Sequence, residues 1–117
     1  MAFPVTNKVA IVTGAGSGIN LAFASLLLEK NCSVLFADLA LRPEAREIVS
    51  QYSSGKNGAR AIFQETDVTD WKQLTRMFEV ADREFGNGKV DIVCPGAGIY
   101  EPVCYQDSQT ILFRNIF

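Results

Sequence analysis

Three glycines at alternate positions, Gly14, Gly16 and Gly18, separate an aliphatic run from a run rich in alanine and leucine. A strand, a glycine turn and a helix start in this order bring backbone N–H groups close to a phosphate. Ser17 offers a hydroxyl, and Ile19 opens the helix. The pattern predicts a site for the pyrophosphate of a dinucleotide, with these five residues as contacts. The alternative is a tight turn that only needs positive φ.

Asp38 follows a second apolar segment, about 20 residues after Gly18. An acidic residue at this place accepts hydrogen bonds from the adenosine ribose hydroxyls and repels a 2′-phosphate. The position therefore favours NAD over NADP, although Arg42 is near enough in sequence to act against that preference. The alternative is a strand-end aspartate that caps the next turn.

Asp67 and Val68 follow a third apolar segment. A carboxylate acceptor beside an apolar side chain suits the amino group and the ring face of adenine. The alternative is that Asp67 caps the helix that starts near Trp71, a role for which Thr69 and Asp70 compete.

A fourth apolar segment ends in small residues at the edge of the predicted sheet where ligands bind in such folds. Small side chains there let the ribose of the cofactor approach closely, and the alternative is simply a glycine-rich turn. The candidate contacts are Gly96, Ala97 and Gly98.

Four strands and three helices must position these residues. Because the strands are continuously apolar and alternate with helices, the sequence predicts a parallel sheet covered on both faces, in an α/β fold. Right-handed crossovers give the strand order 3-2-1-4, the N-terminal half of a doubly wound sheet. We expect residues 1–104 to form this domain, and residues 105–117 show no assignable pattern. The expected strands are 8–13, 33–38, 60–64 and 90–94, and the expected helices are 19–31, 43–52 and 71–85, the last with Trp71, Leu74, Phe78, Ala81 and Phe85 on its apolar face.

Composition limits the function classes. The chain has 117 residues, a net charge of −2 and no basic cluster, which argues against binding to nucleic acid or to an anionic membrane. No apolar run is long enough to span a bilayer, and the first residues do not resemble a signal peptide. Cys32, Cys94 and Cys104 lack metal-ligand spacing, which predicts no metal site and a reducing, cytoplasmic location. Histidine is absent, and neither Cys94, Cys104 nor Tyr105 has an evident partner, so no catalytic residue is predicted.

The four motifs together resemble those of the short-chain dehydrogenase/reductase family. The loop 13–19 resembles its cofactor signature, and Asp38 falls on its NAD-selecting position. Asp67-Val68 resembles its adenine-contacting pair, and the Pro-Gly-Ala-Gly segment 95–98 resembles the form found in fungal members, where most have Asn-Asn-Ala-Gly. The resemblance covers residues 5–103 and implies a Rossmann fold and an NAD(P)-dependent oxidoreductase that acts on CH–OH and C=O groups.

The departures from the family pattern carry expectations of their own. Asn20 stands where the family has a third glycine, and its side chain is expected to push the helix off the sheet and to weaken cofactor binding without abolishing it. Pro95 and Gly96 replace two asparagines, with the loss of side-chain hydrogen bonds that brace the sheet.

The family's catalytic Ser and its Tyr–Lys pair belong downstream of these motifs, and Tyr105 has Gln109 in place of the lysine. The resemblance therefore implies a truncated chain with the NAD-binding half, which needs a full-length form to act on an alcohol or ketone. The alternative is a non-catalytic NAD-binding or interaction module, with the open edge of the fourth strand as a contact for oligomers.

Overall fold

The computed structural model describes residues 4–55, 58–85 and 90–96. Strands and helices alternate through this part of the chain, and all strand pairs are parallel. The strand order is β3-β2-β1-β4, which confirms the predicted half of a doubly wound sheet. The elements are β1 (Val9–Thr13), α1 (Gly18–Glu29), β2 (Ser33–Asp38), α2 (Pro43–Tyr52), β3 (Ala61–Glu65), α3 (Trp71–Phe85) and β4 (Ile92–Pro95).

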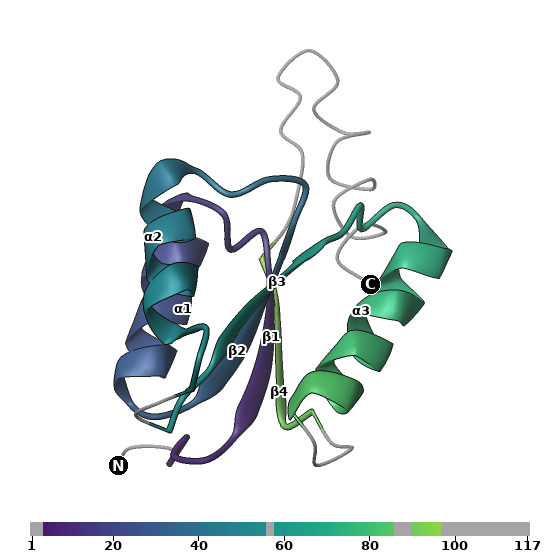
Figure 1. Cartoon of the computed structure of the whole chain (residues 1–117). Helices are drawn as coiled ribbons and strands as arrows, with labels where there is room; N and C mark the ends of the chain where they lie inside the picture. The colour runs from purple at the N-terminus through teal and green to yellow at the C-terminus, as the bar shows by residue number, and fades with distance from the viewer. Residues whose placement is uncertain (1–3, 56–57, 86–89, 97–117) are drawn as a thin grey trace.

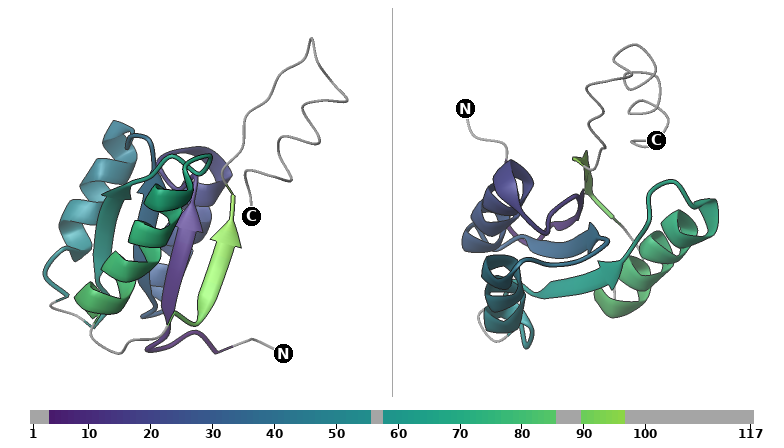
Figure 2. Two further views of the ribbon diagram at one scale, coloured as in Figure 1. Left: turned by 90° about the vertical axis from the view of Figure 1, so that its right-hand side faces the viewer. Right: turned by 90° about the horizontal axis from the view of Figure 1, so that it is seen from above.

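The helices cover both faces of the sheet. In Figure 1 the sheet is seen nearly edge-on, with α1 and α2 on one side and α3 on the other. Figure 2 shows the strands side by side, with β4 at one margin. Among the described residues β4 pairs with β1 alone. No helix in this part of the chain is long and apolar enough to cross a membrane.

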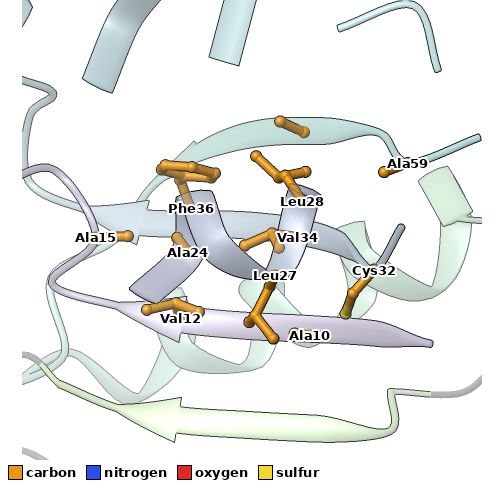
Figure 3. Close-up of a cluster of buried hydrophobic side chains, with 11 residues drawn as sticks. Ala10, Val12, Ala15, Ala24, Leu27, Leu28, Cys32, Val34, Phe36 and Ala59 are labelled. Atoms are coloured by element: carbon orange, nitrogen blue, oxygen red, sulfur yellow. The ribbon is translucent and has the colours of Figure 1, made fainter. Parts of the chain in front are cut away.

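The core forms two layers because successive strand residues point to opposite faces. All five residues of β1 are buried, as expected for a central parallel strand. Val12 of β1 and Phe36 of β2 lie under Leu27 and Leu28 of α1 (Figure 3). On the other face, side chains of β1 and β2 pack against α3: Ile11, Leu35, Ala37, Met77, Val80 and Ala81.

The apolar face of α3 differs from the prediction. Ala81 is buried as expected, but Trp71 is 72% exposed and Phe78 is 41% exposed, and Met77 and Val80 take the buried positions. The apolar stripe of α3 is wider than the part of the sheet that it covers. Trp71 and Phe78 therefore line a groove of about 180 Å³ beside Val93 of β4.

The strand register places the candidate residues at one edge of the sheet. Thr13 at the end of β1 lies opposite Ala37 and Pro95, and Asp38 lies opposite Glu65. The loops that follow all four strands therefore start from the carboxyl edge, where open α/β sheets bind their ligands.

Candidate functional site

A crevice of about 450 Å³ opens at the carboxyl edge of the sheet. The loops after β1, β2, β3 and β4 all contribute to it, so the structure brings together residues from all four predicted motifs. Ala97 and Gly98 lie outside the described residues. The lining residues are Gly14, Ser17, Gly18, Ile19, Asn20, Asp38, Leu39, Thr66, Asp67, Val68, Thr69 and Gly96.

The N-terminus of α1 faces the crevice, and the Ser17 side chain does not cap its backbone N–H groups. Ser17 is the N-cap residue, but its side chain makes no cap hydrogen bond, and the first turn contains no acidic residue. The first N–H groups of a helix have no intrahelical acceptor and carry the positive end of the dipole. In contrast, α2 has a proline and Glu44 in its first turn. Among the described helices, α1 is the one whose start best suits an anion from outside the chain.

The glycine loop has two kinds of glycine. Gly14 and Gly18 have φ values of 71° and 67°, a region that side chains other than Asn and Asp rarely adopt. Gly16 has another role: a Cβ on it would overlap the backbone oxygen of Ala40 and lie 2.6 Å from Asp38 Oδ2. Gly16 is not a lining residue of the crevice. It allows the loop to pack against the segment after β2.

Asp38 connects β2 to the glycine loop. The Gly16 N–H donates to Asp38 Oδ2 at 2.8 Å, and the Leu39 N–H donates to Oδ1 at 2.6 Å. A carboxylate has about four acceptor positions, so two remain for a ligand. The same side chain that faces the crevice therefore also holds the glycine loop in place.

Asp67 does not cap α3. Asp70 does, since its Oδ1 accepts from the Lys72 N–H at 2.9 Å. Asp67 Oδ1 instead accepts from both the N–H and the hydroxyl of Thr69, at 2.9 Å and 2.6 Å. These two hydrogen bonds hold the pKa of Asp67 below its ordinary value, the hydroxyl having the larger effect. Asp67 therefore stabilises a local turn in the crevice wall and is not the N-cap residue of α3.

Replacement of Thr69 by valine is expected to raise the pKa of Asp67. Valine keeps the shape and the backbone N–H but removes the hydroxyl that contributes most to the lowered pKa. Because the pKa is lowered in the fold, the turn gains stability above the unfolded-state pKa and loses it as pH falls through the folded-state value. NMR titration of the Asp67 carboxyl carbon measures the change. An unchanged pKa in Thr69→Val would contradict the assigned cause.

Asn20 contributes a contact that the sequence did not predict. Its Nδ2 donates to the Gly96 backbone oxygen at 2.8 Å and so connects the first turn of α1 to the end of β4. The expectation that Asn20 pushes α1 off the sheet is wrong in this structure, because Gly96 leaves room for its side chain. Glycine at position 96 has no side chain to form a hydrogen bond, and this bond from α1 stabilises the end of β4 in its place.

The described cysteines are poor candidates for nucleophiles. Burial, with a smaller effect of the Asp91 charge, raises the pKa of Cys32 to about 11. Burial also raises the pKa of Cys94. Both are free thiols, and neither lines the crevice. Cys104 and Tyr105 lie outside the described residues. Within the described part of the chain, no group of three or more His, Cys, Asp or Glu residues could hold a metal ion.

Tyr52 has a lysine, Lys56, four residues further on, a spacing that the sequence reasoning overlooked. Tyr52 ends α2 and packs against the core layer under α1 and α2. Because α2 starts near the carboxyl edge and runs back for 10 residues, its end lies about 15 Å along the helix axis from that edge. The spacing alone therefore does not make Tyr52 part of the crevice.

A parallel sheet of this order, with a glycine turn into a helix at its carboxyl edge, is a Rossmann-type fold. The profile of the short chain dehydrogenase family matches residues 8–117, and the chain belongs to this family. Cis-4-hydroxycyclohexanecarboxylate dehydrogenase of Sinomonas cyclohexanicum is 39% identical over 95 residues, which are 81% of this chain and 36% of that protein. The hydroxynaphthalene reductase-like protein Arp2 of Metarhizium robertsii is 33% identical over 98 residues, 84% of this chain and 36% of that protein.

Solved structures have the same fold. NAD⁺-bound xylitol dehydrogenase superposes with a TM-score of 0.69 at 26% identity, over 96% of this chain and 46% of that chain. A short-chain dehydrogenase/reductase of Brucella melitensis superposes with a TM-score of 0.76 at 22% identity, over 100% of this chain and 50% of that chain. This similarity shows the fold alone. The chain thus spans about a third of the length of the two curated relatives.

Proposed function

We propose that the crevice binds NAD(H), with the pyrophosphate at the N-terminus of α1. The observation that carries this proposal is the uncapped start of α1, which opens into the crevice between the strand ends. The adenosine ribose then lies beside Asp38, and adenine lies against Asp67 and Val68. The second ribose lies toward Gly96 and the residues that follow it. We assign residues 1–104 to this dinucleotide-binding domain.

The environment of Asp38 favours NAD over NADP. A 2′-phosphate on the adenosine ribose would meet a carboxylate that the fold holds in place. Arg42, which could have offset this charge, points its guanidinium toward Glu44 at 4.0 Å and is not among the lining residues. The repulsion is therefore not compensated by a cation of the crevice wall.

For the whole protein we propose an oxidoreductase that acts on a small alcohol or ketone in the cytoplasm. Two of the similar proteins are named as dehydrogenases, and one of them is solved with NAD⁺ bound. A bound nicotinamide ring supplies hydride chemistry, and the residues of this chain bind and orient the dinucleotide. No described residue is placed to act as the general acid or base of hydride transfer.

Titration of the purified chain with NADH and NADPH tests the proposal. Trp71 is the only tryptophan and lies two residues from Thr69 in the crevice wall, so its fluorescence reports binding. We expect NADH to bind about tenfold or more tightly than NADPH, and ADP to compete with NADH. Equal affinity for the two would contradict the role of Asp38. Absence of binding by NADH, NADPH and ADP alike would contradict the dinucleotide site.

A further inference from the structure

We propose that Asn20 and Gly96 form a matched pair that fixes the spacing between α1 and β4, with Asn20 as a positioning residue for the second ribose of the dinucleotide. This inference rests on the proposed NAD(H) site.

The first observation is the hydrogen bond itself. Asn20 is the third residue of α1 and Gly96 directly follows β4, so the contact joins positions 76 apart in the chain. Both residues line the crevice. The bond holds the first turn of α1, which carries the free N–H groups, at a fixed place relative to the end of β4.

The second observation is the shared space. A Cβ built on Gly96 would fall on the amide group of Asn20. The φ angle of Gly96 is not in the left-handed region, so the backbone conformation does not require glycine there. The requirement comes from Asn20, whose amide occupies the place of a side chain at position 96.

Asn20 and Gly96 lie in a different part of the crevice from the proposed adenosine contacts. Asp38 and Asp67 belong to the loops after β2 and β3, whereas Asn20 and Gly96 lie between α1 and β4. Because β1 separates β2 from β4 in the sheet, the two sets lie on opposite sides of the glycine loop. A ligand that ends at the pyrophosphate reaches the first set and the start of α1 but does not extend to Gly96. A whole dinucleotide must pass Asn20.

A swap of the two residues tests the pairing without any ligand. Asn20→Gly removes the hydrogen bond, and Gly96→Asn displaces the Asn20 amide, so each variant breaks the same contact. We expect each to lower Tm by about 4–8 °C, and the double variant to lose clearly less than the sum of the two shifts. Ser25→Ala is the matched control, since the Ser25 hydroxyl bonds to Leu21 within α1 and makes no contact with Gly96. Its Tm shift should add to that of Gly96→Asn. Additive shifts for Asn20→Gly and Gly96→Asn would overturn the pairing.

Comparison of NADH with ADP tests the positioning role. We expect Asn20→Gly to raise the Kd of NADH about fivefold or more and that of ADP by a clearly smaller factor, with recovery of NADH affinity in the swapped double variant. Equal weakening of both ligands would overturn the role, because a merely structural defect affects both. If the unmodified chain binds neither ligand, the proposed function and this role fail together. The Tm measurements then still decide whether the two residues are paired.

Discussion

Replacement of Asp38 by alanine is expected to raise the Kd of NADH about 10- to 100-fold and to remove the preference over NADPH. Hydrogen bonds to a charged group contribute about 1.5–3 kcal/mol each. The Asp38 carboxylate is expected to accept such bonds from the ligand, and it accepts others from the backbone. Its free acceptor positions face the crevice, and its oxygens hold the Gly16 and Leu39 N–H groups. Fluorescence titrations with NADH and NADPH measure both effects.

Two further variants separate these functions of Asp38. Asp38→Asn keeps the shape and one acceptor oxygen but loses the charge, so it should improve NADPH binding while it retains more of the NADH affinity than alanine does. Glu65→Ala is the matched control, because Glu65 is an exposed carboxylate opposite Asp38 in the register that does not line the crevice. A loss of NADH affinity in Glu65→Ala as large as that in Asp38→Ala would contradict the specific role of Asp38.

Gly16→Ala is expected to lower the free energy of unfolding by about 2 kcal/mol or more and to abolish measurable NADH binding. A methyl group at this position overlaps a backbone oxygen, that of Ala40, and crowds Asp38 Oδ2. Backbone cannot rotate away as a side chain does, so the glycine loop must separate from the segment after β2. Overpacking of this kind costs about 1–3 kcal/mol. Urea unfolding measures the cost.

Gly18→Ala provides the comparison for Gly16. An added Cβ on Gly18 meets nothing within 4 Å, so the change costs only the strain of a positive φ, about 1 kcal/mol. Gly18→Asn should cost less, because asparagine adopts this conformation more readily. If Gly16→Ala destabilises the chain no more than Gly18→Ala does, close packing against Ala40 is not the reason for glycine at position 16.

The fold could be predicted because its signals are local. Four continuous apolar runs with turn residues between them define buried parallel strands, and the glycine turn after the first strand favours the doubly wound order β3-β2-β1-β4. The end of α1 shows the limit of local signals. The helix stops at Glu29, earlier than expected, because Asn31 adopts a φ of 65° and the Cys32 N–H turns back to the Leu27 oxygen.

The site was predicted less completely because its contacts join distant segments. The positions of Gly14, Gly18, Asp38 and Asp67 at the crevice could be predicted because these residues follow strand ends. The packing role of Gly16 depends on a loop that follows the next strand, and the role of Asn20 depends on a glycine 76 positions away. The exposure of Trp71 likewise depends on how much of the sheet α3 can cover. Side-chain type and spacing do not contain this information.

The pairing of β1 with β4 also sets an order of events during synthesis. Among the described strands, β1 leaves the ribosome before the others and later lies between β2 and β4. The Val9 N–H of β1 donates to Asp91, a residue 82 positions further on and just before β4. At about 5–20 residues per second, roughly 4 to 16 seconds of translation separate the two segments. Throughout that time the nascent chain carries an apolar strand with one unpaired edge, a form that favours aggregation and that chaperones bind.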